Sequence, residues 1–424
     1  MVRRRVVLSA FAFSPARGSE PGIGWNIASR VAAYHDVTVL CCPQLGDENH
    51  RQEVEEHIQK HGPVSGMEVR YVEAPLLSRL FQKPLISFAT PFYFIGYAAW
   101  QRAAFAEAKR LHAARKFELA HQLTITTFRE PGHLWKLGIP FVWGPVAGAS
   151  NVPRKYFKLF SARDWMFYSV KNTLNSIHKR LKFRSRQAAR AASHIFATTA
   201  EDHALVTERW GRECEFMPDT GAPDLQGSVR NYDGKRPLRL VWSGLHAGRK
   251  ALPLLLVALA RLKRESADPR VSLKILGGGD QSDAWKSLAH GLGIDDVVTW
   301  TGPLPRDRAL EEMRDADVFV FTSIQEGTSS VVMEALALGL PVICHDACGM
   351  ALVIDETCGI KIPMDGPDVS QRAIFAAIKT LQADPPRVRS LSAGALARAR
   401  ELSWERKAQE IAKIYDLILQ PCVC

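Results

Sequence analysis

Two glutamates, Glu326 and Glu334, stand in the stretch QEGTSSVVMEALALGLPV (325–342). Glu326 lies among small residues, whereas the residues around Glu334 are all apolar. An ionised carboxylate buried in an apolar segment needs partners. The hydroxyls of a bound ribose would serve. The alternatives are a glutamate on the helix surface or one paired with an internal arginine.

The segment between the two glutamates predicts the start of a helix. A strand-like run, DVFVFTS, precedes the loop, and Thr328, Ser329 or Ser330 would cap the helix. Gly339 would end it. Free N–H groups at a helix start bind anions, and here they would follow the carboxyl end of a strand. The sequence therefore predicts an anion site beside Glu326.

Two adjacent cations, Arg249 and Lys250, precede the apolar run ALPLLLVALARLK (251–263), which we predict to be a helix. Cations are disfavoured near the positive end of a helix dipole unless an anion neutralises them. A bound diphosphate would neutralise them. The alternative is that both side chains extend into solvent.

The loop GSEPGIGW (18–25) carries Gly22 and Gly24 ahead of a predicted helix, WNIASRVAAY. Glycines allow the backbone to approach a ligand closely, although a plain turn would need them as well. The loop does not satisfy the GxGxxG pattern of dinucleotide-binding proteins, which argues against NAD.

His121, in LAHQLT, falls near the predicted carboxyl end of a strand, where it could position a hydroxyl. The alternative is a hydrogen-bonded histidine of the core. The DAD sequence (315–317) has the spacing of a metal-binding pair, but Asp317 opens a buried strand, at the end opposite to where ligands bind. We therefore expect no metal and no cofactor.

These residues need a framework of strands and helices. From Leu238 onward, apolar runs of strand length alternate with helical ones, and the strands are LRLVWSG, SLKILGGG, VVTWTG, DVFVFTS, PVICHD and GIKIP. Such strands, apolar throughout, indicate a parallel sheet covered on both faces. RRVVLSAFAF, DVTVLCC and FELAHQL begin the same pattern in the first half. We therefore predict an α/β fold with two Rossmann-like, doubly wound domains facing each other across a cleft.

Bulk composition fits a globular protein. The chain has 424 residues, of which 46% are hydrophobic and 23% charged. The basic start alternates like a strand, so we expect no signal peptide. The uncharged stretch 84–101 is short for a membrane span and contains Pro91. The eight cysteines form no CxxC pairs, which favours reduced thiols.

Positive charge is concentrated in one segment. The net charge is +11, and the segment from Arg154 to Arg190 holds eleven lysines or arginines against one acid, Asp164. Apolar residues recur there at helical spacing on one face: Phe167, Val170, Leu174, Ile177 and Leu181. The segment is either a solvated basic helix packed on the N-terminal domain or a helix on an anionic membrane surface. Together with 84–101, a membrane helix could receive a lipid-linked acceptor.

The order of these motifs resembles the retaining GT-B glycosyltransferases of the family 4 type. Their E-x7-E motif is met by Glu326 and Glu334, preceded by RKALPLLL and LGGGD, and the likeness is strongest over residues 238–365. GSEPGIGW and IPFVWGPVAG look like a subgroup that makes bacterial polysaccharides. LSWERKAQEIAKIYDLIL (402–419) is similar to the closing helix that crosses back to the N-terminal domain.

The resemblance implies a domain plan. Residues 1–217 would form an acceptor-side domain with basic and aromatic insertions. Residues 218–237, rich in Pro, Gly and Asp, would be the linker. Residues 238–400 would form the nucleotide-sugar domain, and 401–424 the returning helix.

The resemblance also implies roles for the residues already named. Glu326 would hold hydroxyls of the donor sugar, and Glu334 the ribose. Lys250 would pair with the diphosphate, which the glycines at 22 and 24 would approach from the other domain. His121 would lie near the reacting carbon. The backbone N–H groups around the sugar and phosphate would come from Gly327, Thr328, Ser329 and Ser330.

The chain departs from the family at one position. The family has an arginine directly after the glycine of SG, where this chain has Leu245. Arg249 or His246 would then be the second cation beside Lys250.

The resemblance implies a retaining, metal-independent transferase that moves a sugar from a nucleoside-diphosphate sugar to a glycan or lipid-linked acceptor in polysaccharide biosynthesis. We expect it in the cytoplasm, including the inner face of the plasma membrane. A GT-B nucleotide-sugar epimerase or hydrolase would use the same pocket. A nucleic-acid-binding protein would explain the basic segment but not the two glutamates.

Overall fold

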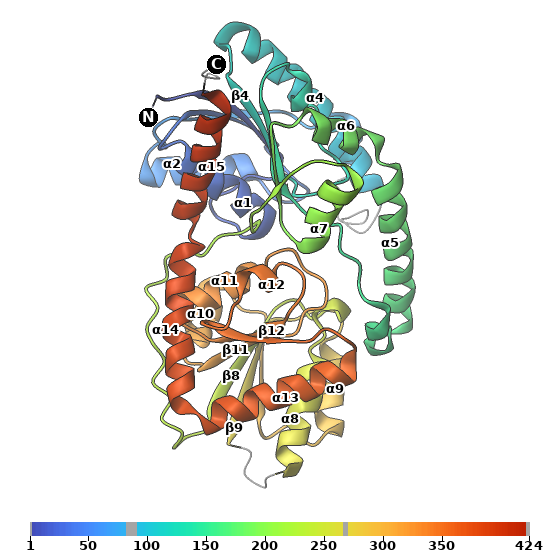
Figure 1. Cartoon of the computed structure of the whole chain (residues 1–424), viewed down its shortest axis with the longest axis vertical. Coiled ribbons are helices and arrows are strands. Elements are labelled where there is room, and N and C mark those ends of the chain that lie inside the picture. Colours follow the sequence, from blue (N-terminus) through green and yellow to red (C-terminus); the bar gives the residue numbers. More distant parts are fainter. Residues whose placement is uncertain (1, 82–90, 266–269, 421–424) are drawn as a thin grey trace. The chain divides into compact units, whose positions relative to one another are not determined.

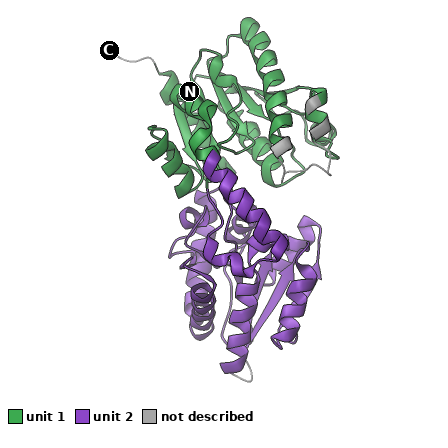
Figure 2. Ribbon diagram, turned by 90° about the vertical axis from the view of Figure 1, so that its right-hand side faces the viewer, with its two compact units in different colours: residues 1–149, 178–220, 404–424 green, residues 150–177, 221–403 purple. Residues whose placement is uncertain are grey.

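A computed structural model describes residues 2–81, 91–265 and 270–420. The chain divides into two compact units (Figure 2). Unit 1 comprises residues 1–149, 178–220 and 404–424, and unit 2 comprises residues 150–177 and 221–403. Each unit is built around one sheet with helices on both faces (Figure 1).

Among the described residues, unit 1 contains a seven-stranded sheet in the order β3-β2-β1-β4-β5-β6-β7. All the pairings are parallel. The strands are β1 (Arg5–Ala10), β2 (Asp36–Cys41), β3 (Met67–Tyr71), β4 (Leu119–Thr124), β5 (Phe141–Val146), β6 (His194–Ala197) and β7 (Glu215–Phe216). The order reverses direction between β1 and β4.

The described part of unit 2 contains a six-stranded sheet in the order β10-β9-β8-β11-β12-β13, again with parallel pairings. The strands are β8 (Leu238–Ser243), β9 (Val271–Leu276), β10 (Val298–Gly302), β11 (Val318–Phe321), β12 (Val342–His345) and β13 (Gly359–Ile362). The order reverses between β8 and β11. Both sheets thus have the doubly wound order of the Rossmann fold, which confirms the predicted fold class.

Helices cover both faces of each sheet. In unit 1 they are α1 (Ser19–Val31), α2 (His50–His61), α3 (Leu76–Phe81), α4 (Pro91–Arg115), α6 (Phe183–Ala191), α7 (Ala200–Ala204) and α15 (Trp404–Leu419). In unit 2 they are α8 (Pro253–Glu265), α9 (Ser282–Gly291), α10 (Arg306–Arg314), α11 (Ser330–Ala337), α12 (Met350–Val353), α13 (Pro367–Ala383) and α14 (Pro385–Glu401). Helix α5 (Ala162–Leu181) begins in unit 2 and ends in unit 1.

The last helix, α15, belongs to the core of unit 1. It lies alongside α1 (Figure 1). Its Trp404, Ile411 and Tyr415 are buried in one apolar cluster with residues of β1 and β2. The predicted closing helix therefore exists, and it completes a sheet face begun at the other end of the sequence.

Two predicted boundaries differ from the observed division into units. Residues 150–177, expected in the N-terminal domain, group with unit 2, because Val152, Tyr156 and Tyr168 join its apolar core. Most of the predicted linker, from Gly221 onward, also belongs to unit 2. Within it, the buried side chain of Arg230 donates to the carbonyl of Leu338 and packs there as part of the domain.

Two other expectations concern the membrane and the cysteines. No helix in the described part of the chain is both long and apolar enough to cross a membrane. Of the uncharged stretch 84–101, residues 84–90 lie outside the described residues, and the rest begins α4. The six described cysteines are free thiols, as predicted, whereas Cys422 and Cys424 lie outside the described residues.

Candidate functional site

The sheet of unit 2 identifies where a ligand would bind. In doubly wound sheets, ligands lie outside the carboxyl ends of the strands where the strand order reverses. In unit 2 that place is between β8 and β11. The loop after β8 carries Arg249 and Lys250, and the loop after β11 carries Glu326. The sheet thus brings together three residues singled out from the sequence.

Lys250 and Arg249 converge on a single oxygen of Glu326. The Lys250 Nζ atom lies 2.9 Å from Glu326 Oε2, and Arg249 Nη1 donates to the same oxygen. The Ser323 hydroxyl also donates to it at 3.0 Å. None of the residues that the structure describes donates to the other oxygen, Oε1. The predicted alternative, in which both cations extend into solvent, is therefore wrong.

Burial and charge act against each other in this cluster. Burial raises the pKa of the Glu326 carboxyl, but Lys250 and Arg249 outweigh it, so this pKa lies below its ordinary value. Burial lowers the pKa of the Lys250 ammonium, and Glu326 only partly offsets that effect. Lys250 is 7% exposed. A buried ammonium of this kind interacts strongly with any anion that reaches it.

Hydrogen bonds join the two loops that hold the cluster. The Ile324 N–H donates to the Arg249 carbonyl at 2.9 Å, and the Thr322 hydroxyl donates to the Lys250 carbonyl at 2.6 Å. The loop after β9 packs closely on the loop after β8. The contact is so close that a Cβ at Gly277 would collide with the Gly244 carbonyl. Gly277 also has φ +112, a conformation that favours glycine. These contacts hold the cations and the carboxylate in fixed relation.

Helix α11 follows Glu326 and begins after Ser329, one of its three predicted caps. The Ser329 side chain makes no capping hydrogen bond. Thr328 and Ser329 are buried, Gly327 is half-buried and Ser330 is exposed. The N–H groups of the first turn therefore lack a side-chain cap, and such groups favour an anion. Gly339, at φ +76, follows the helix end as predicted.

Glu334 lies on α11 among buried residues, as the apolar run predicted. Its Oε1 atom accepts from Arg306 Nε at 2.8 Å and lies 2.8 Å from Arg306 Nη2. Burial raises the pKa of Glu334, and Arg306 only partly counters that effect. Arg306, at the start of α10, is itself largely exposed. Glu334 thus pairs with an arginine, as one alternative had it, but this arginine is exposed and not internal.

Leu245 occupies the position where the resemblance implies an arginine, and His246, one of the two possible substitutes, follows it. Leu245 is exposed. His246 is buried beside the rings of Trp242, Trp285 and Trp300, and its Nδ1 atom lies 2.8 Å from the Ser282 hydroxyl. Burial lowers the pKa of His246 to about 4. His246 is therefore neutral at pH 7, which leaves Arg249 as the second cation beside Lys250.

Gly22 and Gly24 lie in a helix, not in a loop. Helix α1 begins at Ser19, so Gly22 and Gly24 fall within its first two turns. A Cβ at Gly24 would lie 2.5 Å from the Ala12 carbonyl, and one at Gly22 would collide with the Arg17 carbonyl. The expected loop at 18–25 is therefore wrong from Ser19 onward, where α1 begins. Both glycines allow α1 to pack closely on the chain's own backbone.

His121 is the third of six residues in β4, not a residue of its carboxyl end. Its ring is fully buried between two partners. Nδ1 lies 2.5 Å from the Tyr415 hydroxyl, and Nε2 lies 2.7 Å from the Gly144 carbonyl. Burial lowers the pKa of His121 to about 4. These contacts are those of a hydrogen-bonded core histidine, the alternative weighed from the sequence.

A carboxylate that the sequence analysis passed over lies at the reversal point of unit 1. Glu20, in the first turn of α1, accepts from the Thr126 N–H at 3.1 Å and from its hydroxyl at 2.6 Å. Thr126 follows β4, the neighbour of β1. Burial raises the pKa of Glu20 to about 7. An acid in the first turn of the helix after β1 was the signal that could have identified it.

The DAD sequence has a structural role. Asp317 immediately precedes β11, at the opposite end of the sheet from Glu326. It is buried, accepts from Arg236 at 2.7 Å, and accepts from the Arg239 side chain at 3.2 Å. In the described residues, no three His, Cys, Asp or Glu side chains lie together as a metal ligand set.

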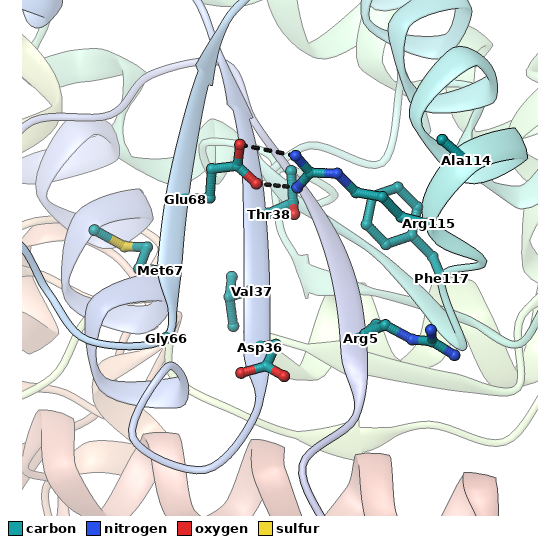
Figure 3. Close-up of a pocket in the computed structure, with 10 residues that line it drawn as sticks. All are labelled: Arg5, Asp36, Val37, Thr38, Gly66, Met67, Glu68, Ala114, Arg115 and Phe117. Carbon is teal, nitrogen blue, oxygen red and sulfur yellow. Dashed lines mark hydrogen bonds and ion pairs between the residues drawn. The ribbon is translucent and has the colours of Figure 1, made fainter.

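A cavity of 590 Å³ lies elsewhere in unit 1 (Figure 3). It is at the amino ends of β1, β2 and β3, where Arg5, Asp36 and Met67 line it. The Glu68–Arg115 ion pair crosses one side. Because ligands of doubly wound sheets bind at the carboxyl ends, we assign no ligand to this cavity.

Comparison with known proteins adds a family. The family described as "Glycosyl transferases group 1" matches residues 235–395. The D-inositol 3-phosphate glycosyltransferase of Streptomyces bingchenggensis (strain BCW-1) is 29% identical over 250 residues, which are 54% of this chain and 54% of that protein. The chain thus spans about half the length of the curated relatives it matches.

Solved structures resemble nearly the whole chain. Sucrose-phosphate synthase from Thermosynechococcus elongatus has a TM-score of 0.64 at 17% identity, covering 98% of this chain and 99% of that one. Anabaena Alr3699/HepE in complex with UDP and glucose has a TM-score of 0.59 at 15% identity, covering 98% and 100%. Residues 235–395 thus match the glycosyl transferases group 1 family, and each of the two units has the parallel α/β fold found in GT-B glycosyltransferases.

Proposed function

We propose that the chain is a retaining, metal-independent glycosyltransferase. It moves a sugar from a nucleoside-diphosphate sugar to a glycan or lipid-linked acceptor in polysaccharide biosynthesis, at the inner face of the plasma membrane. The observation that carries this proposal is the convergence of Lys250 and Arg249 on Glu326 at the strand-order reversal of unit 2. This cluster lies in the segment that matches the glycosyltransferase family.

Each part of the cluster suits one part of the donor. Lys250 and Arg249 would bind the diphosphate, together with the uncapped N–H groups before and within the first turn of α11. Glu326 would accept hydrogen bonds from sugar hydroxyls, first at Oε1. Glu334 would accept from the ribose hydroxyls. The HepE structure, solved with UDP and glucose, supports a donor of this chemical class.

The proposed reaction breaks the bond between the anomeric carbon and the diphosphate oxygen. Negative charge develops on that oxygen, and Lys250, Arg249 and the helix start stabilise it. The acceptor hydroxyl attacks from the face that the diphosphate leaves, which retains the configuration, and its proton passes to the departing phosphate. Glu326 orients the sugar in this scheme, because two cations already neutralise its carboxylate.

The names of the curated relatives point to a second class of acceptor. The relatives named D-inositol 3-phosphate glycosyltransferase match about half of their length to this chain. We therefore include an inositol phosphate among the acceptors to be tested beside lipid-linked glycans. Transfer to the inositol phosphate alone would replace the polysaccharide assignment without changing the donor site.

A panel of nucleoside-diphosphate sugars tests the proposal. We expect one donor to raise the melting temperature of the chain, and Lys250→Met to remove that shift. Lys274→Met is a matched control, since Lys274 pairs with Glu312 in the same unit. Transfer should persist in EDTA, and NMR should show a retained anomeric configuration.

Two results would contradict the proposal. If no donor changes the melting temperature, the donor site assigned to unit 2 is wrong. If donor is consumed to free sugar or to an isomer while no acceptor is glycosylated, the chain is a hydrolase or an epimerase.

A further inference from the structure

Helix α5 is turned with its apolar side outward. Its outer face carries large apolar residues at the three- and four-residue intervals of one helical stripe. Met166 is 62% exposed, Val170 55% and Ile177 42%. The full set on this face is Met166, Phe167, Val170, Leu174, Ile177 and Leu181. A helix on the surface of a soluble domain normally buries such a stripe, so this exposure needs a partner.

The opposite face of α5 holds the helix to the protein with polar groups. Asn172 bonds both the N–H and the carbonyl of Val152, at 3.1 and 2.8 Å. Asn175 donates to the Ser150 carbonyl at 3.1 Å, and Lys179 donates to the Ala149 carbonyl at 2.7 Å. These polar anchors fix the orientation of the helix. The apolar stripe therefore cannot turn inward without breaking them.

Cations accompany the exposed stripe. Arg180 is exposed at the end of α5, and Arg190 is exposed at the end of α6. The segment that holds both helices carries most of the net charge of the chain. An exposed apolar stripe in a segment rich in lysines and arginines matches helices that lie in the plane of an anionic bilayer surface. Charge of one sign thus favours one occupant, a membrane with anionic headgroups.

We propose that α5 docks this chain on an anionic membrane surface, with Met166, Val170 and Ile177 inserted among the lipids and arginines of the same basic segment on the headgroups. This proposal rests on the proposed function in one respect: a docked chain would be close to a lipid-linked acceptor. The same helix contacts the donor loop, since Lys171 donates to the Gln325 side chain at 3.0 Å. Docking at α5 therefore fixes the donor loop of unit 2 near the lipid surface.

Flotation of the full chain with phosphatidylcholine vesicles, with and without phosphatidylglycerol, tests the proposal. We expect binding only to the anionic vesicles. The triple variant Met166→Glu, Val170→Glu, Ile177→Glu should abolish it. A matched control, Leu76→Glu, Val229→Glu, Leu417→Glu, alters three other exposed apolar residues and should bind like the natural chain.

The arginines give a second, graded readout. Each removed cation should lower the partition coefficient onto anionic vesicles about fivefold, which corresponds to about 1 kcal/mol. The double variant Arg180→Gln, Arg190→Gln should therefore bind roughly 25-fold more weakly. Raising the salt concentration should weaken the natural chain in the same direction.

Three results would overturn the proposal. One is no flotation with anionic vesicles, and another is flotation that the triple variant leaves intact. The third is a dimer in sedimentation that the triple variant turns into monomers, since a second copy would then cover the stripe. The donor-induced melting shift should be unchanged in the triple variant, so loss of donor binding in all chains would refute the proposed function alone.

Discussion

The two candidate partners of Lys250 differ in charge at neutral pH. Arg249 carries a guanidinium, whereas burial keeps His246 neutral. We expect Arg249→Met to lower kcat roughly 100-fold, as for loss of one group that stabilises the leaving oxygen. His246→Gln should lower it less than about tenfold, since it removes no charge. Initial rates of sugar transfer, with melting temperatures of both variants, check this. A larger loss in a well-folded His246→Gln variant would contradict it.

Variants of Glu334 and Arg306 distinguish a ligand-binding role of Glu334 from a structural role in the ion pair. Loss of a hydrogen bond to a charged group costs about 1.5–3 kcal/mol, so Glu334→Gln should weaken nucleoside-diphosphate binding at least tenfold. Arg306→Gln should change it less than about threefold, because the exposed arginine contributes little. Isothermal titration measures both. Equal losses in the two variants would mean that the ion pair, not the ribose, requires Glu334.

His121 gives a pH-dependent prediction. Its pKa in the folded chain, about 4, lies below the ordinary value of 6.5, so folding favours the neutral ring. The stability it contributes is complete above pH 6.5 and is lost as the pH falls toward 4. Between pH 7.5 and pH 5, the free energy of unfolding of the natural chain should therefore fall by roughly 2 kcal/mol more than that of His121→Gln. Denaturant titrations at both pH values measure this difference. A constant difference would show that His121 is not held neutral.

The sequence predicted which residues form the unit 2 site, but it did not predict which side chains they pair with. Glu326 and Lys250 stand in the loops that follow β11 and β8, and parallel strands bring such loops to one edge of the sheet. The Arg306–Glu334 pair joins two helices, and no spacing rule connects them. The burial of His121 and its bond to Tyr415 depend on a helix from the far end of the chain.

At the scale of elements, α1 shows how a glycine can mislead. Pro21 and three glycines looked like a loop, yet proline is tolerated in a first helical turn. Gly22 and Gly24 are needed because backbone carbonyls lie against the helix, a contact that no local pattern encodes.

The glycines of this helix can be tested with a matched pair. Gly24→Ala should lower the free energy of unfolding by about 1–3 kcal/mol, because its Cβ would press on the Ala12 carbonyl. Gly18→Ala, with nothing within 4 Å of its Cβ, should cost less than about 1 kcal/mol. Chemical denaturation compares the two. Normal stability with lost donor binding in Gly24→Ala would instead support the predicted approach of this glycine to the diphosphate.

Helix α5 shows what apolar periodicity in a sequence does not predict. The spacing of Phe167, Val170 and Leu174 predicted the helix and its apolar face. Periodicity does not say whether that face turns inward, because the direction depends on the anchors on the other side. Here Asn172, through two bonds to Val152, turns it outward.

At the scale of the molecule, the strand order of both sheets was implied by the alternation of strands and helices. The division into units was not, since residues 150–177 leave unit 1 and the chain returns at 178. Residues 150–177 join the unit in whose core Tyr156 and Tyr168 pack. Both cores contain large apolar side chains, so the sequence does not show which core that is.

The return of the chain to unit 1 predicts the effect of truncation. A stop after Ser403 removes Trp404, Ile411 and Tyr415 from the core of unit 1. Each such loss costs about 2–5 kcal/mol, so the three losses together are comparable to the roughly 5–15 kcal/mol that stabilise a typical domain. We expect the truncated chain to aggregate or to lose protease resistance in unit 1, whereas a stop after Leu419 keeps α15 and should behave like the full chain. Circular dichroism and limited proteolysis compare them. A folded, resistant unit 1 without α15 would contradict this account.

The sharing of one carboxylate oxygen by two cations has a consequence for the order of events in a catalytic cycle. In the proposed function, an arriving donor would exchange partners: its phosphates would take Lys250 and Arg249, and its sugar would replace them at Glu326. After transfer, the nucleoside diphosphate would keep the cations but offer Glu326 no hydroxyl, so a bare carboxylate would remain in a largely buried place. The spent nucleotide would thereby bind less tightly than the donor, and the re-forming ion pair would help to expel it.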